Sequence, residues 1–93
     1  MSIIRINEFQ AAEGKGDELF NFLKTLIPYI SSSDGCLSCE VLRKTDDSNN
    51  FVVLEKWVST ESHKASIENY PKEKMQAALP LLGMPPKGSF YHA

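Results

Sequence analysis

Residues 51–58 read FVVLEKWV, a run with the alternation of a β-strand. Successive side chains of a strand point to opposite sides of its sheet. One face would therefore carry Phe51, Val53, Glu55 and Trp57, and the other Val52, Leu54, Lys56 and Val58. Both faces are largely apolar, which predicts that helices cover one of them and that a second copy of the chain covers the other.

Three further strands are predicted around this one. The segment from Cys36 to Lys44 should pair with it antiparallel, because the polar residues 45–50 between them are of the types that form hairpin turns. The segment from Ser2 to Gln10 is rich in Ile and Phe and predicts a strand at the start of the chain. The segment from Gly88 to His92 is long enough only for a short edge strand.

The clearest helix begins at Asp17. Apolar residues recur there with the spacing of one helix face, at Leu19, Phe22, Leu23, Leu26, Ile27 and Ile30. Pro28 is expected to bend or loosen the last turn, because it lacks an N–H group. Ser59 or Thr60 can cap a second helix, which Pro71 interrupts, and a short third helix follows.

The elements follow one another as strand, helix, strand, strand, helix, strand. This is the order of the split β-α-β-β-α-β unit, a ferredoxin-like α+β fold with a four-stranded antiparallel sheet. No repeat or linker divides the sequence, so residues 1–93 are predicted to form one domain. A chain of 93 residues buries a modest core alone. Together with the two apolar faces of residues 51–58, this predicts a homodimer.

Composition excludes several classes of partner. The net charge is -2 and no basic stripe is visible, so neither nucleic acid nor an anionic membrane surface is an expected partner. No run resembles a signal peptide or a membrane span, and the two cysteines suit a reducing cytoplasm. Cys36 and Cys39 are expected on opposite faces of their strand, as free thiols, and no metal site is predicted because no ligand spacing is present.

Two runs carry a family resemblance. Asp34-Gly35-Cys36-Leu37 leads into a strand, and a later strand ends in Glu55-Lys56-Trp57-Val58-Ser59-Thr60-Glu61. In this order they resemble the antibiotic biosynthesis monooxygenase domain family, in which Gly-Cys-Leu precedes strand two and Glu-x-Trp-x-Ser-x-Glu closes strand three. The resemblance spans nearly the whole chain. It implies a dimeric α+β barrel with a pocket between each sheet and its helices, and oxygenation of a phenolic or quinol substrate without metal or flavin cofactor.

Three residues are candidates for catalysis. His63 suits proton transfer near neutral pH, Asn7 is a carboxamide in an Ile-rich strand, and the indole N–H of Trp57 could face a ligand. Many members of the resembled family place a helix histidine at the position of Ser66, so His63 lies one turn earlier than that residue. A cavity for a small apolar or aromatic ligand is expected among these residues and Ser66, Ile67, Tyr70 and Phe22.

Two other functions stay open. The same cavity could hold a small metabolite without turnover, because the sequence shows no nucleophile with an adjacent base. It could also support an isomerase or lyase reaction. Glu55 shares a face with Trp57, and a buried ion pair with a basic partner is expected for it.

Overall fold

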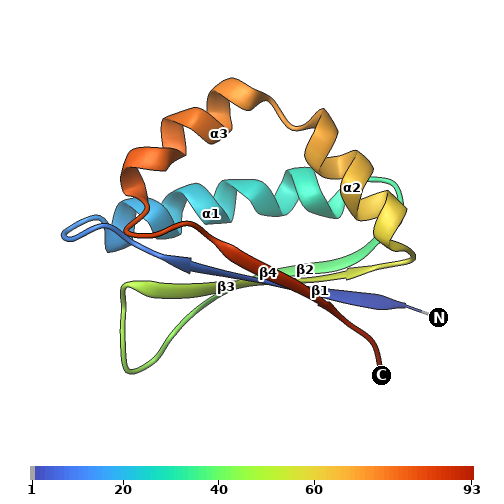
Figure 1. Ribbon diagram of the computed structural model, residues 1–93, viewed down its shortest axis with the longest axis horizontal. Helices are drawn as coiled ribbons and strands as arrows, with labels where there is room; N and C mark the ends of the chain where they lie inside the picture. Colours follow the sequence, from blue (N-terminus) through green and yellow to red (C-terminus); the bar gives the residue numbers. More distant parts are fainter. Residues whose placement is uncertain (1) are drawn as a thin grey trace.

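The computed structural model describes residues 2–93 and shows one antiparallel sheet with helices packed against a single face (Figure 1). The sheet has four strands in the order β2-β3-β1-β4. In chain order the elements are β1 (Ile3–Gln10), α1 (Gly16–Ser31), β2 (Cys36–Arg43), β3 (Asn50–Trp57), α2 (Thr60–Asn69), α3 (Lys72–Ala78), the 3-10 turn η1 (Leu79–Leu81) and β4 (Lys87–Tyr91). The ferredoxin-like α+β prediction is confirmed.

Helix α1 contributes the helical side of the core. Leu19, Leu23 and Leu26 are buried along one stripe, as the spacing predicts, and they pack with Phe51 and Val53 of β3. Pro28 lies inside α1, which continues to Ser31. The backbone N–H of Ser32 still donates to the carbonyl of Pro28 at 3.2 Å. The proline therefore removes one donor from the last turn without ending the helix.

The turn into β2 requires a glycine. Gly35 has a φ of 85°, a conformation that other residues adopt at a cost. A Cβ at this position would also lie 2.6 Å from the Cβ of Ser62, near the start of α2. The Gly-Cys-Leu run thus brings the start of β2 close against the first turn of α2. That turn is capped by Ser59, whose hydroxyl accepts a hydrogen bond from the N–H of Ser62.

A β-bulge in β2 changes the expected placement of the two cysteines. The register pairs Cys36 with Trp57 and Cys39 with Glu55, and the pairing shifts between Cys36 and Ser38. Glu55 and Trp57 share a face of β3, so both cysteines lie on the side of the sheet that the helices cover. The prediction of opposite faces is wrong because a bulge inserts one unpaired residue and resets the alternation. Both cysteines are free thiols.

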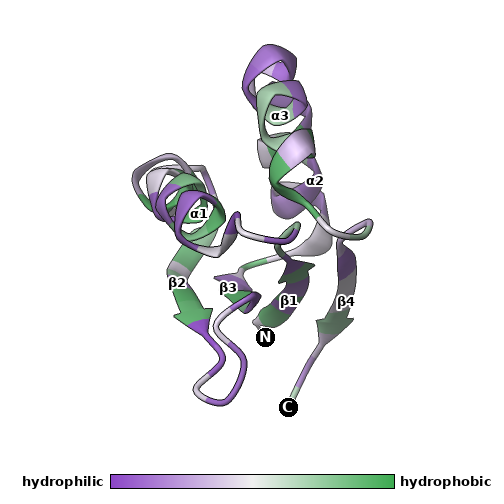
Figure 2. Ribbon diagram, turned by 90° about the vertical axis from the view of Figure 1, so that its left-hand side faces the viewer, coloured by the Kyte–Doolittle hydropathy of each residue, from purple (hydrophilic) through white to green (hydrophobic). Residues whose placement is uncertain are grey.

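The opposite face of the sheet is not covered by any part of residues 2–93. Figure 2 shows the helices and the sheet as two layers, with the helices on one side only. Strand register places a group of apolar side chains on the uncovered face, at Ile4, Ile6, Leu42, Val52 and Leu54. None of these is fully buried, and Leu42 is 46% exposed.

Among residues 2–93, no helix is long and apolar enough to cross a membrane.

Candidate active site

A cavity of about 210 Å³ lies between the covered face of the sheet and helices α1 and α2. Strands β1 and β3 contribute its floor, because their register places alternate residues of both strands on this face. Six of the seven residues that the sequence singles out line it, namely Asn7, Trp57, His63, Ser66, Ile67 and Tyr70. The other lining residues are Phe9, Leu26, Tyr29, Ile30, Val53, Glu55, Met75 and Pro86.

Phe22 lies outside this cavity. Helix α1 turns Leu19, Leu23 and Leu26 toward the sheet, so Phe22 faces a separate hollow between α1 and α3. The rings of Tyr29 and Tyr70 meet edge to face, with centroids 5.1 Å apart, and both line the cavity as well as this hollow. This aromatic pair lies between Phe22 and the cavity. The expected contact of Phe22 with a ligand is therefore not supported by the geometry.

Glu55 is the centre of a hydrogen-bond network on the cavity floor. Its Oε2 accepts a hydrogen bond from Nδ2 of Asn7 at 2.9 Å, and its Oε1 accepts one from Nε1 of Trp57 at 2.9 Å. Asn7 in turn accepts a hydrogen bond at Oδ1 from Nε of Arg5 at 2.8 Å. Glu55 is 4% exposed, so these contacts replace the water that an exposed carboxylate would have.

This network bears on two expectations. The nearest basic partner of Glu55 is His63, at 3.9 Å, whereas its hydrogen-bond donors are the neutral N–H groups of Asn7 and Trp57. Trp57 donates its only N–H group to Glu55, so that group is not free to bind a ligand. Trp57, which is 1% exposed, therefore forms a wall of the cavity and fixes the carboxylate.

His63 lies above Glu55 on the first turns of α2. It is 5% exposed, and its ring meets those of Trp57 and Phe90 edge to face, with centroids 5.5 Å and 5.1 Å apart. Burial lowers the pKa of His63, and the positive charge of Arg5 lowers it further. A histidine with a lowered pKa is neutral at pH 7, so a nitrogen of its ring is free to accept a proton.

The pKa of Glu55 is shifted the other way. Burial raises it, while the hydrogen bond from Trp57, the charge of Arg5 and the hydrogen bond from Asn7 oppose the rise. His63, with a lowered pKa, and Glu55, with a raised pKa, thus lie 3.9 Å apart. Pairs with shifted pKa values are common where proteins transfer protons. No group of three His, Cys, Asp or Glu side chains suited to a metal ion occurs among residues 2–93.

The α2 side of the cavity is held to α1 by hydroxyl groups. The hydroxyl of Tyr29 donates to the carbonyl of Ser66 at 2.6 Å, and the Oγ atoms of Ser33 and Ser66 lie 2.9 Å apart. Ser66 is therefore a fixed part of the wall. Ile67 is 58% exposed and lies at the rim. The sequence analysis missed Tyr29, although its position three residues after Leu26 on the same helix was a usable signal.

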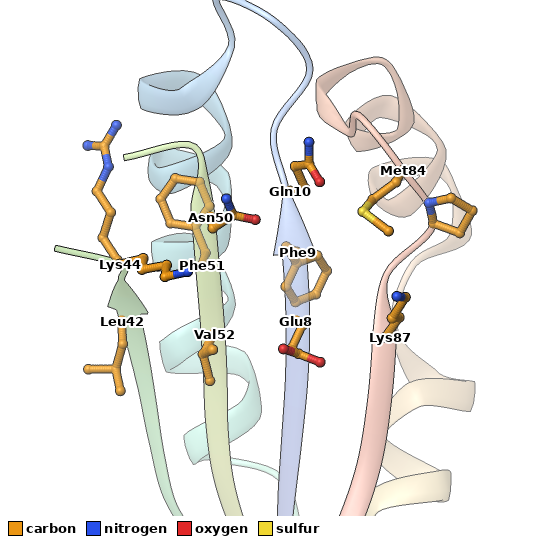
Figure 3. A pocket seen from close by; sticks show the side chains of 12 residues that line it. Glu8, Phe9, Gln10, Leu42, Lys44, Asn50, Phe51, Val52, Met84 and Lys87 are labelled. Atoms are coloured by element: carbon orange, nitrogen blue, oxygen red, sulfur yellow. The ribbon is translucent and has the colours of Figure 1, made fainter. Parts of the chain in front are cut away.

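A larger hollow, of about 520 Å³, opens at the end of the sheet beside the β2–β3 turn. Figure 3 shows its side chains, which include Glu8, Lys44 and Lys87 from three different strands or their ends. None of the residues predicted for the site lines it. It contains no histidine and no buried acid, so we place the candidate active site in the smaller cavity, where a base and a carboxyl group meet.

Comparison with known proteins decides the family. A family model described as antibiotic biosynthesis monooxygenase matches residues 2–78. The chain belongs to this family. A comparison with curated proteins finds no match.

Solved structures of the same shape include several bacterial proteins. A protein from Nitrosomonas europaea superposes with a TM-score of 0.90 at 16% identity, over 99% of this chain and 89% of that one. PA3566 from Pseudomonas aeruginosa gives 0.89 at 19% identity, over 99% and 93%. SnoaB from Streptomyces nogalater, described as a cofactor-independent oxygenase, gives 0.83 at 15% identity, over 99% and 92%. At these identities the likeness shows the fold of this family member.

Proposed function

We propose that this protein is a cofactor-independent monooxygenase that acts on a small phenolic or quinol-type substrate. One observation carries the proposal: a buried His63 lies beside the buried carboxyl group of Glu55 in a largely apolar cavity. Membership of the monooxygenase family supports it, as does the likeness to SnoaB, a protein described as a cofactor-independent oxygenase.

The chemistry follows from what each group can do. His63 takes the proton of the substrate hydroxyl, and the resulting anion is electron-rich enough to reduce dioxygen. The substrate supplies all four electrons that dioxygen takes up. A ring carbon that carries two hydrogens in the keto form of the phenol becomes a carbonyl; one oxygen atom enters there, and the other leaves as water with the two hydrogens. Glu55, 3.9 Å from His63, stabilises the imidazolium that forms.

The rest of the cavity suits a small aromatic ring. Leu26, Ile30 and Val53 exclude water, which strengthens the electrostatic contacts of the bound anion. The hydroxyl of Tyr70 has no hydrogen bond within residues 2–93 and is available as a donor. A volume of about 210 Å³ is below the ~300–1,000 Å³ of sites for drug-sized ligands. Substrates of one or two rings fit this limit.

The second part of the proposal is a homodimer. The apolar group on the uncovered face, at Ile4, Ile6, Leu42, Val52 and Leu54, is the surface that a second sheet would bury. Two such sheets face to face bury apolar side chains that one copy leaves in water. Each cavity opens on the other side of its own sheet, so each copy keeps a complete site.

Oxygen uptake tests the function. We expect uptake with one- and two-ring hydroquinones or naphthols, and incorporation of one atom from heavy-isotope dioxygen into the product. Peroxide formation without incorporation would identify an oxidase instead. Conversion without oxygen uptake would favour the isomerase or lyase alternative. Thermal stabilisation by these compounds with no conversion would favour a binding module.

A further inference from the structure

Arg5 does not line the cavity, yet it is connected to the cavity floor. Its Nε donates to Oδ1 of Asn7 at 2.8 Å, and its guanidinium carbon lies 4.6 Å from the centre of the Phe90 ring. The register of the sheet places Arg5 between Glu55 of β3 and Phe90 of β4. The side chain thus lies on the covered face, in a position set by three strands.

Strand β4 leaves room for this side chain by means of a glycine. Gly88 is the cross-strand partner of Asn7. A Cβ at Gly88 would overlap the guanidinium of Arg5 and would lie 2.5 Å from Oδ1 of Asn7, closer than a packed methyl group can approach. The guanidinium of Arg5 therefore lies between the ring of Phe90 and the space that the absence of a side chain at Gly88 leaves.

The contact with Arg5 fixes which way the Asn7 carboxamide points. With Oδ1 bonded to the cation, only Nδ2 can face the carboxyl group of Glu55. Rotating the amide by half a turn would set an acceptor against Glu55 and a donor against Arg5, so both hydrogen bonds would be lost. Asn7 and Trp57 then hold one oxygen of Glu55 each, which leaves Oε1 at 3.9 Å from Nε2 of His63.

We propose that Arg5 is a positioning residue of the site: held between Phe90 and Gly88, it locks Asn7 and, through Asn7, the carboxyl group of Glu55 beside His63. The importance of this series of contacts for turnover rests on the proposed function. The contacts themselves are present in the unliganded protein.

The charges around His63 make this series of contacts measurable, because they affect the titration of Glu55 and His63. The cation of Arg5 favours the ionised form of Glu55 and disfavours the ionised form of His63, so it lowers the pKa of both groups. Other titratable groups near the pair come from every neighbouring element. They are Cys36 and Cys39 on β2, Tyr29 on α1, Tyr70 after α2, and Glu61, Lys64 and Glu68 around the outer side of His63.

Nuclear magnetic resonance of the unliganded protein tests the proposal. Trp57 is the only tryptophan, so its indole N–H signal is assigned without ambiguity, and it follows the ionisation of Glu55, to which it is hydrogen-bonded. The ring signals of His63 are separated from those of His92 by a His92→Ala variant. We expect Arg5→Gln to move both titration midpoints to higher pH, because the cation is lost, and Arg5→Lys to restore part of the shift.

The Gly88→Ala variant distinguishes the effect of the position of the Arg5 guanidinium from the effect of its charge. Its methyl group displaces the guanidinium from Asn7 while the charge stays on the chain, so the indole midpoint should shift in the same direction as in Arg5→Gln, by a smaller amount. Lys87→Gln is the matched control, because it removes a cation from β4 on the uncovered face, and its midpoints should equal those of the wild type.

Unchanged midpoints in both Arg5→Gln and Gly88→Ala would overturn the proposal, as would an equal shift in Lys87→Gln. If Arg5→Gln fails to fold, Arg5→Lys and Gly88→Ala still decide the matter. None of these measurements uses a substrate, so a failed oxygen-uptake assay leaves the positioning chain standing. If the protein does turn over a hydroquinone, Arg5→Gln should lower kcat about 10-fold and shift the pH profile to higher pH, with part of the loss restored in Arg5→Lys.

Discussion

Nε2 of His63 lies 3.9 Å from Oε1 of Glu55, and the two side chains are 7% and 4% exposed. The separation is beyond the ~3.2 Å limit of a good N–H···O hydrogen bond, so the pair is in charge-pairing range without being bonded. A proton arriving on His63 would create a cation beside the carboxyl group of Glu55, and that cation would favour the ionised form of the carboxyl group. The pair can therefore receive a proton from a ligand in the cavity with little movement.

Substituting His63 should remove most of the activity. His63→Ala is expected to lower turnover of a hydroquinone substrate by ~10²–10⁴, the usual contribution of a positioned base. Steady-state oxygen uptake measures the effect. His92→Ala is the matched control, since His92 is exposed near the chain end, and it should keep the wild-type rate. Equal rates in both variants would show that His63 is not the base.

The lowered pKa of His63 predicts a stability that depends on pH. An unfolded chain protonates this histidine below about pH 6.5, whereas the folded protein resists protonation to lower pH. The free energy of unfolding should therefore fall as pH drops below 6.5. Glu55, with a raised pKa, acts in the opposite direction, because the folded state takes up its proton first.

Comparison of variants isolates the histidine contribution. Both the wild type and His63→Gln retain Glu55, so the difference between them removes its effect. In urea unfolding at pH 7 and pH 5, the wild type should lose more stability than His63→Gln, and His92→Gln should follow the wild type. A slope that is the same in all three proteins would contradict a lowered pKa at His63.

Trp57 should be important for stability as well as for the site. Trp57→Phe leaves Oε1 of Glu55 without its donor and opens space beside a side chain that is 1% exposed. We expect a loss of about 2–4 kcal/mol in the free energy of unfolding, from the missing hydrogen bond and the cavity together. Urea unfolding followed by circular dichroism measures it. Ile67→Val, at an exposed position, should stay within ~0.5 kcal/mol of the wild type.

The cysteines should be slow to react while the protein is folded. Burial, followed by the charge of Glu55, raises the pKa of Cys39 to about 12, and the same two causes raise the pKa of Cys36. Because the thiolate is the reactive form, iodoacetamide at pH 8 should modify Cys36 first and Cys39 later. In denaturant without a reductant, mass spectrometry should show two alkyl groups per chain. A single disulfide-linked species would contradict the assignment.

Local periodicity was enough to predict the main elements. The stripe of α1 and the alternation of β3 are repeated signals, and burial of Leu19, Leu23 and Leu26 follows from the first of them. The side of the sheet on which Cys36 lies could not be predicted in this way. A bulge changes the alternation by one residue, and its occurrence depends on how β2 fits against β3 and not on a local pattern.

The partners of Glu55 illustrate a second limit. The sequence correctly placed Glu55 beside Trp57 on one face of a strand, but it did not indicate which neutral groups would donate hydrogen bonds to the carboxyl group. The neutral donor that the structure provides, Asn7, is 48 positions away. Which side chain reaches the carboxyl group is set by the register between β1 and β3, where Arg5 and not Asn7 is the cross-strand neighbour of Glu55. The partner of Glu55 therefore depends on the tertiary structure and not on a local sequence pattern.

The proposed dimer can be tested at one position of the uncovered face. Leu54 lies on β3 at the centre of the sheet, with Ile6 and Glu40 as its cross-strand neighbours, and its side chain points away from the cavity. Leu54→Arg would place a charge in the proposed interface, where burial without a partner is costly. Sedimentation at micromolar concentration should show twice the chain mass of 10.4 kDa for the wild type and the chain mass for the variant. Leu79→Arg, which changes an exposed leucine in the helical layer, should remain dimeric. A wild type that sediments as a monomer, or a Leu54→Arg variant that stays dimeric, would show that the sheets do not pack face to face.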